Sequence, residues 1–339
     1  MRSFTCENCG QLLFFENSRC LRCSSPLGFD SLSRELTVLG PPGTAEDQLP
    51  RCANAALAAC NWVPDEGQEL CASCSLTRTR PNDADLKDDG LRALTTAEAA
   101  KRWLLFGLGE LGLSTAEDLA FDLLFSLRGP VLTGHSEGVI TIDLAESDDA
   151  QREQRRAELG EPYRTVLGHF RHEVAHYYWA TLFEGSDRLE GWRERFGDDR
   201  IDYQTALERH YEHGPPQDWS REYVSAYATM HPWEDWAETF AHYLHIRDTL
   251  QTAGAYGLSV AGPPRRPDPA LIAAPAAADP AREGFDRVLD DWLPLTYALN
   301  AINRSMGHDD LYPFTLAPAV VDKLAFVHDT VLAAGSART

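Results

Sequence analysis

The stretch LGHFRHEVAHYYWATLF, residues 167–183, combines the period of an amphipathic helix with a compact group of polar side chains. Its apolar residues recur at three- and four-residue intervals, and it has no Pro and no Gly after its second residue, so it predicts an α-helix. Gly185 follows the expected end, as is typical of helix C-termini. His172 and His176 lie one turn apart on the same face of that helix, with Glu173 beside them.

Two imidazoles one helical turn apart can bind the same metal ion. Zinc held by two neutral imidazoles and a third ligand keeps one position open for water, and a neighbouring carboxylate can take the proton of that water as it attacks a carbonyl carbon. In this interpretation His172 and His176 are zinc ligands and Glu173 is the general base. The alternative is a buried helix that carries two histidines by chance.

A second helix, predicted to begin at Pro232, supplies the missing ligand. In residues 223–245, YVSAYATMHPWEDWAETFAHYLH, Glu234 and Glu238 lie one turn apart. Glu234 completes a tetrahedral site, and Glu238 can accept a hydrogen bond from the far nitrogen of a zinc-bound imidazole. Because 57 residues separate Glu234 from the second histidine, Asp235 and Glu238 are alternative ligands. The competing interpretation is an acidic first turn stabilised by the helix dipole.

All eight cysteines lie in the first 74 residues, in a pattern of metal-ligand spacing. No long apolar run follows the N-terminus or occurs elsewhere, so we expect a cytoplasmic protein without a signal peptide or a membrane partner. In a reducing compartment this pattern indicates zinc and not disulfides. One structural zinc site is expected at two C-x2-C pairs separated by ten residues, Cys6, Cys9, Cys20 and Cys23. A second is expected at Cys52, Cys60, Cys71 and Cys74.

The second cysteine site leaves alternatives open, because only its last two members form a C-x2-C pair. Either Cys52 or Cys60 could be a buried thiol, or ligands could exchange between the two sites. So small a ribbon lacks a core, and metal binding should contribute much of its folding free energy. Its arginines are spread out, and the chain carries a formal net charge of −21, so a scaffold or protein-contact role is expected and no nucleic-acid partner.

The fold class predicted from these patterns is α+β and mostly helical, with a zinc ribbon followed by a metallopeptidase-type domain and a small antiparallel sheet. The expected divisions are a ribbon domain over residues 1–80, a linker over 81–94 and a catalytic domain over 95–339. Further helices are expected over residues 95–112, 114–127, 202–211, 284–306 and 317–334. Residues 131–135 and 138–144 predict a hairpin joined by a four-residue turn, whose free edge could pair with extended substrate.

The zinc ribbon, followed by the stretches CNW, TGH, DLAE, EPYRTVLGHFRHEVAHYYW, FGDDRIDY and SAYATMHPWEDWAETFAHYLHI, resembles the bacterial zinc-binding metallopeptidases that carry an N-terminal ribbon. These proteins are diagnosed by their likeness to gluzincins. The last stretch is also similar to the catalytic domain of the anthrax lethal factor type. In that group the third ligand begins an E-x-x-x-E helix, and a tyrosine seven residues before it stabilises the oxyanion.

The resemblance implies a gluzincin-like fold with His172, His176 and Glu234 as zinc ligands and Glu173 as general base. It also implies that Glu238 accepts a hydrogen bond from a zinc-bound histidine. It also implies an oxyanion donor, and the residue seven positions before the third ligand is Tyr227. His231, close to the start of the same helix, is the rival donor. His210 and His213 are possible ligands, although surface histidines are commoner.

Together these features predict a zinc-dependent hydrolase, in the first place a metalloprotease that cleaves a peptide or protein substrate by zinc-activated water, with Glu173 as base. One catalytic and two structural Zn²⁺ ions are expected. The alternatives are a non-catalytic zinc-binding scaffold, a nucleic-acid-binding ribbon with an accessory domain, and an amidase acting on a non-protein amide.

Overall fold

The computed structural model describes residues 2–40, 50–113, 115, 118–125, 131, 133–147, 165–262, 272–275 and 284–336. They form two compact units. The ribbon unit comprises Arg2–Phe106 and Ala116–Arg155, and the helical unit comprises Gly107–Thr115 and Arg156–Thr339. The predicted boundaries at 80 and 94 follow sequence motifs and not contacts, so that division stays a prediction. The fold class is confirmed: the chain is α+β and mostly helical, with small sheets.

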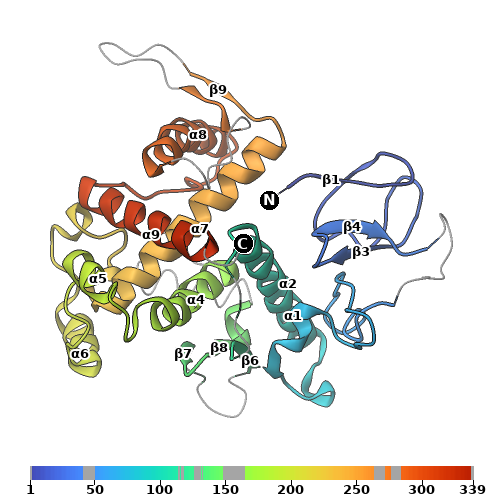
Figure 1. Cartoon of the computed structure of the whole chain (residues 1–339), viewed down its shortest axis with the longest axis horizontal. Helices are drawn as coiled ribbons and strands as arrows, with labels where there is room; N and C mark the ends of the chain where they lie inside the picture. The colour runs from blue at the N-terminus through green and yellow to red at the C-terminus, as the bar shows by residue number, and fades with distance from the viewer. Residues whose placement is uncertain are drawn as a thin grey trace. The chain divides into compact units, whose positions relative to one another are not determined.

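The N-terminal part of the ribbon unit is built from two antiparallel pairs of short strands (Figure 1). Strand β1 (Phe4–Thr5) pairs with β2 (Leu12–Leu13), and β3 (Leu27–Asp30) pairs with β4 (Glu35–Val38). Aromatic rings fill the space between them: Phe15 lies 5.0 Å from Phe29 and 5.0 Å from Phe106, centroid to centroid. This cluster gives the ribbon the apolar core that its own strands are too short to supply.

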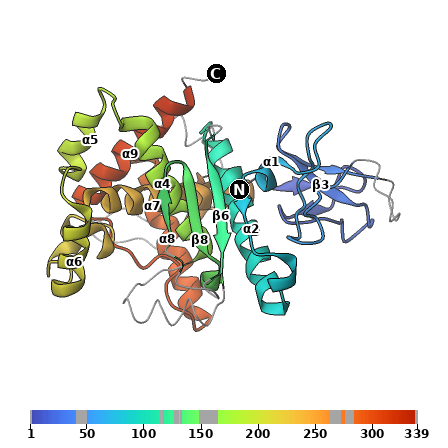
Figure 2. The same cartoon turned by 90° about the horizontal axis from the view of Figure 1, so that it is seen from below.

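The ribbon unit also contains a four-stranded mixed sheet, in the order β5-β6-β8-β7. Its strands are β5 (Thr77–Thr79), β6 (Ala120–Leu124), β7 (Gly134–Ser136) and β8 (Val139–Asp143). The β5–β6 and β6–β8 pairs are parallel, and only β7 and β8 are antiparallel, so the prediction of a small antiparallel sheet is wrong for this mixed sheet. Figure 2 shows β6 and β8 side by side. The short helical turns of this unit are α1 (Ala72–Ser75), η1 (Asp83–Asp85) and η3 (Leu144–Ser147).

The prediction of a helix over residues 114–127 is wrong for β6, the part of that segment with regular described structure. Phe121 and Leu123 are fully buried, and the strand is paired on both sides, so tertiary pairing overrides the helical spacing. The β7–β8 hairpin is confirmed, but its first strand is Gly134–Ser136 and not residues 131–135, and its turn is centred on Glu137 and Gly138. Glu137 and Gly138 have φ values of 47° and 80°, the left-handed pair that a tight type I′ turn requires.

Helix α2 (Asp88–Glu110) lies in the ribbon unit up to Phe106. The main helices of the helical unit are α4 (Val166–Phe183), α5 (Leu189–Phe196), α6 (Tyr203–His213), α7 (Pro232–Ala255), α8 (Phe285–Ser305) and α9 (Pro318–Ser336). The helical unit also contains η4 (Trp219–Arg221), η5 (Tyr227–Thr229) and the paired strands β9 (Val260–Ala261) and β10 (Ile272–Ala273). The helices predicted over 202–211, 284–306 and 317–334 are confirmed within two residues. Helix α2 begins inside the expected linker, because Asp88 and Asp89 favour a helix N-terminus.

Helix α7 is the centre of the helical unit and packs against α4, α5, α8 and α9 (Figure 1). The contact with α4 is fixed by the Trp236 indole, which is fully buried and donates a hydrogen bond from Nε1 to the Ala175 carbonyl over 2.8 Å. One turn along α7, the Phe240 ring stacks on Tyr178 with centroids 5.7 Å apart. An ion pair between Arg171 and Asp248 joins the same two helices. The relative position of α4 and α7 is therefore set by buried contacts.

None of the helices in the described part of the chain is both long enough and apolar enough to cross a membrane.

Candidate metal centres

Helix α4 carries the two histidines as the sequence predicts. Thr165 caps it, with its side-chain oxygen accepting a hydrogen bond from the Gly168 N–H over 2.9 Å, and Gly185 follows its end with φ 68°. The His172 and His176 rings lie on one face with their centroids 5.0 Å apart. Their Nε2 atoms are 3.3 Å apart, so the two rings direct their Nε2 atoms toward a common position.

Helix α7 brings the third donor to that point. It begins at Pro232, as predicted, and Glu234 falls in its first turn with 3% of its surface exposed. The Oε2 atom of Glu234 lies 2.9 Å from His172 Nε2, and its Oε1 atom lies 3.5 Å from His176 Nε2. The donor atoms of the three side chains all lie within 4.8 Å of one another.

The chemistry of this group fits a zinc ion with one free position. Two imidazoles and one carboxylate are the donors of a common class of zinc enzyme. Behind them, Glu238 Oε1 lies 2.7 Å from His172 Nδ1, so that nitrogen donates the hydrogen bond and Nε2 is left as the metal-facing acceptor. Burial disfavours charge on Glu234, but the facing His176 and His172 outweigh it and hold the pKa of Glu234 well below its usual range.

Glu173 lies next to the first histidine in a dry environment, with 8% of its surface exposed. Burial raises the pKa of Glu173 above its ordinary value, and the Glu234 charge adds to this, while the imidazoles of His172 and His176 oppose it. A carboxylate whose pKa moves toward neutrality is a better proton acceptor in a reaction near pH 7.

Two tyrosines complete the surroundings of the donor group. The Tyr227 ring lies 6.1 Å from the His172 ring, centroid to centroid. Tyr203, at the start of α6, donates a hydrogen bond from its hydroxyl to Glu234 Oε1 over 3.0 Å. Burial raises the pKa of both phenols, so both remain protonated donors. Sequence reasoning missed Tyr203, although it ends the stretch FGDDRIDY that the family resemblance includes.

His231 and Asp235, which the sequence offered as alternatives, have other partners. His231 is the N-cap of α7: its Nδ1 accepts from the Trp233 N–H over 3.1 Å, and its Nε2 donates to the Ile201 carbonyl over 3.0 Å. Both of its ring nitrogens are therefore engaged. Asp235 turns toward α9, where its carboxylate lies 2.6 Å from Lys323 Nζ.

The eight cysteines form two separate groups, each with its four sulfurs within 4.8 Å of one another. In the first group the Sγ atoms of Cys6 and Cys23 are 3.6 Å apart, as are those of Cys9 and Cys20. In the second, the Cys71 side chain caps α1 by accepting from the Cys74 N–H, and all four residues are buried. Cys52 and Cys60 belong to this group, so both tetrads fit the four-thiolate site of structural zinc.

His210 and His213 belong to none of the metal-binding groups that the described residues contain.

A ribbon with two four-thiolate groups, followed by two packed helices that bring two imidazoles and a carboxylate together, defines a zinc-binding protein of the metallopeptidase class. Residues 91–330 match the family model described as "Putative zinc-binding metallo-peptidase", and residues 3–85 match that of a zinc-ribbon domain. The chain belongs to this metallopeptidase family, as its sequence resemblance indicated.

Relatives of nearly equal length occur in mycobacteria. Proteins recorded as uncharacterized in Mycobacterium tuberculosis and Mycobacterium bovis are each 51% identical to this chain over 341 residues. The match covers 98% of this chain and 95% of each relative. No solved structure matches the chain.

Proposed function

We propose that the chain is a zinc-dependent metalloprotease that uses water to cleave peptide bonds, with His172, His176 and Glu234 as its catalytic metal site. One observation carries the proposal: the donor atoms of these residues converge from α4 and α7, with Glu173 beside them. In this proposal residues 95–339 form a catalytic domain of gluzincin-like fold. Residues 1–80 form a ribbon domain whose two zinc ions are structural.

Each residue has a role set by its contacts. Zinc, when bound, supplies a Lewis acid that polarises the scissile carbonyl and lowers the pKa of water. Glu173 accepts the proton of the attacking water and passes it to the leaving amine. Tyr227 donates a hydrogen bond to the oxygen on which negative charge develops. Glu238 holds the tautomer of His172.

Tyr203 is a positioning residue in this scheme, and His231 is not the oxyanion donor. The hydroxyl of Tyr203 holds the carboxylate of Glu234 through one oxygen, which leaves the other for the metal. His231 uses its two nitrogens to fix the start of α7 and the chain at Ile201, and this supports Tyr227 as the donor.

The test compares the zinc-loaded chain with its Glu173→Gln variant on a pool of fluorogenic peptides. We expect the variant to lose roughly a thousandfold or more in kcat and to keep its zinc, because the amide cannot accept the proton. Glu184→Gln is the matched control, since Glu184 is exposed at the end of the same helix. Zinc content is measured by mass spectrometry in all three proteins.

The alternative functions give different outcomes. A scaffold would retain three zinc ions and cleave nothing, with or without Glu173. An amidase of non-protein substrates would hydrolyse simple acyl amides, leave the peptide pool intact and still depend on Glu173. Equal peptide cleavage by the parent and Glu173→Gln proteins would contradict the assigned base.

A further inference from the structure

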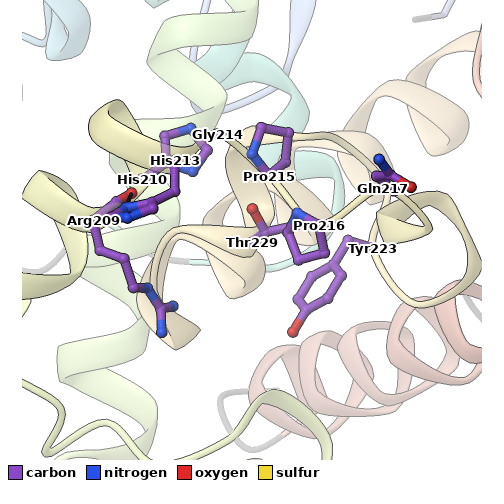
Figure 3. Close-up of a pocket in the computed structure, with 9 residues that line it drawn as sticks. All are labelled: Arg209, His210, His213, Gly214, Pro215, Pro216, Gln217, Tyr223 and Thr229. Carbon is purple, nitrogen blue, oxygen red and sulfur yellow. Dashed lines mark hydrogen bonds between the residues drawn. The ribbon is translucent and has the colours of Figure 1, made fainter.

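A pocket of about 550 Å³ lies between the end of α6 and η5 (Figure 3). Its polar lining comes from Arg209, His210, His213, Gln217, Tyr223 and Thr229, and Pro215 and Pro216 form an apolar wall. A volume of several hundred cubic ångströms is in the range of sites that bind a ligand group. The pocket can therefore receive a side chain together with part of its backbone.

The two elements that line this pocket also contribute to the metal centre. Tyr203 and His210 lie seven residues apart on α6, which places them on the same helix face two turns from each other. Tyr203 contacts Glu234, while His210 lines the pocket. In the same way η5 begins with Tyr227, whose ring lies 5.9 Å from His210, and ends with Thr229, which lines the pocket. The pocket thus lies about 10 Å, two helical turns along α6, from the residue that contacts Glu234, within reach of an extended peptide bound at the metal centre.

The lining of the pocket is cationic on a chain whose formal net charge is −21. Arg209 supplies a permanent positive charge, and the residues that line the pocket include no Asp or Glu. Of the neighbouring acids on α6, Glu208 accepts a hydrogen bond from Gln204 over 2.9 Å, and Glu212 lies 4.0 Å from His213 of the lining. In the described part of the chain, the Arg209 guanidinium forms no ion pair.

Two further polar groups of the pocket, the His210 ring and the Tyr223 hydroxyl, can donate hydrogen bonds. Burial and the nearby Arg209 charge lower the pKa of His210, so its ring is neutral at pH 7 and has one N–H. Burial raises the pKa of Tyr223, so its hydroxyl stays protonated. Figure 3 shows the Arg209 guanidinium and the Tyr223 hydroxyl projecting to the same side of the pocket. A guanidinium flanked by neutral donors is a binding site for a carboxylate.

We propose that this pocket binds a carboxylate of the substrate through Arg209, and that the enzyme therefore selects peptides with a carboxylate close to the scissile bond. The inference rests on the proposed peptidase function and names its substrate class. The carboxylate is either an acidic side chain or the free C-terminus of a peptide, because a guanidinium binds both in the same way.

The first experiment measures binding without turnover, using the zinc-loaded Glu173→Gln chain. The probes are three fluorescein-labelled octapeptide pools of uncharged random sequence: one amidated with a central Glu, one amidated with a central Gln, and one with a central Gln and a free C-terminal carboxylate. We expect one carboxylate pool to bind about tenfold more tightly than the amidated Gln pool. The pool that does so identifies the source of the carboxylate.

The assignment of Arg209 is tested in the same background. Arg209→Gln should remove the preference, and Arg209→Lys should retain part of it, because lysine keeps the charge but not the fork of donors. Arg221→Gln is the matched control: Arg221 is exposed near the pocket but does not line it, and the preference should persist. Equal or absent binding of all three pools would overturn the proposal, and so would a preference that survives Arg209→Gln.

Cleavage by the unmodified zinc-loaded chain separates this inference from the function on which it rests. With a proteome-derived peptide library, we expect acidic residues or chain ends to be enriched at one fixed position from the cut. Efficient cleavage without such enrichment would contradict the proposed carboxylate specificity of the pocket but not the proposed peptidase function. A binding preference that depends on Arg209, without any cleavage, would contradict the proposed peptidase function but not the proposed carboxylate site.

Discussion

Tyr227 is the single residue whose replacement best separates chemistry from metal binding. Its ring lies 6.1 Å from the His172 ring, centroid to centroid, and the proposed metal ligands are His172, His176 and Glu234. We expect Tyr227→Phe to lower kcat by about a hundredfold, with zinc content and KM nearly unchanged, because the variant loses the hydrogen bond proposed to the developing oxyanion. Steady-state kinetics with parallel metal analysis measures this. A larger effect of His231→Gln on kcat, with zinc retained, would favour the rival donor.

At the residue scale, the convergence of His172, His176 and Glu234 could be predicted because their chemistry and spacing are visible along one chain, whereas their roles and that of Glu173 stay predictions. The position of His172 and His176 on one face follows from the period of a helix. The position of Glu234 in a first turn follows from the helix start that Pro232 marks. Tyr203 could not be predicted from spacing, because its contact with Glu234 depends on how α6 packs.

The start of helix α4 is an element-scale feature that the site depends on. Thr165 accepts a hydrogen bond from the Gly168 N–H, two turns ahead of His172. Thr165→Ala should therefore lower the free energy of unfolding by about 1 kcal/mol, whereas Thr165→Ser should leave it nearly unchanged. Urea unfolding of the zinc-loaded proteins measures the difference. The same stability for the Ala and Ser variants would show that the cap does not hold the helix.

Elements could be predicted where the local pattern and the tertiary environment agree. The predicted helices that became α6, α8 and α9 have helical spacing and exposed faces, and all three are confirmed. Strand β6 was missed because its apolar run is short and its partners lie far away in sequence, at β5 and β8. Periodicity alone does not distinguish such a buried strand from a helix.

The molecule as a whole should hold three zinc ions of different lability. We expect close to three per chain by elemental analysis, two of them resistant to a mild chelator, because thiolate sites closed by four ligands exchange slowly. Of these two, the tetrad of Cys52 is buried at all four residues, whereas Cys9 and Cys23 of the other are partly exposed. The Cys6 tetrad should therefore lose its zinc before the Cys52 tetrad as the chelator concentration rises. The reverse order would contradict the role of burial.

Stability should depend on pH through a histidine buried in α7. Burial lowers the pKa of His242 to about 4, with Glu238 opposing this and Arg171 adding to it, and its Nδ1 lies 2.8 Å from the Tyr312 hydroxyl. The unfolded chain binds this proton near pH 6.5, so it gains protons before the folded chain does. The free energy of unfolding should therefore fall as the pH drops from 6.5 toward 4, by about 3 kcal/mol from this group when complete.

Urea unfolding at pH 7 and pH 5 measures this dependence. His242→Gln cannot take up the proton, so its stability should change less between the two pH values than that of the parent chain. His213→Gln is the control, because the side chain of His213 is 71% exposed. Equal pH dependence in the parent and His242→Gln proteins would contradict the prediction.

Helix α1 connects, along the chain, the cysteine group of Cys52, Cys60, Cys71 and Cys74 to the first strand of the four-stranded sheet. Its cap is Cys71, it contains Cys74, and β5 begins two residues after it ends. The Leu76 carbonyl between them already accepts a hydrogen bond from the Phe121 N–H of β6 over 2.8 Å. If zinc is scarce during synthesis, Cys71 and Cys74 have no metal to hold α1 in place, and β5, which follows α1, loses that support. Newly made chains would then expose the apolar strand β6 to proteolysis. The amount of intact protein in a cell would then report on its zinc supply.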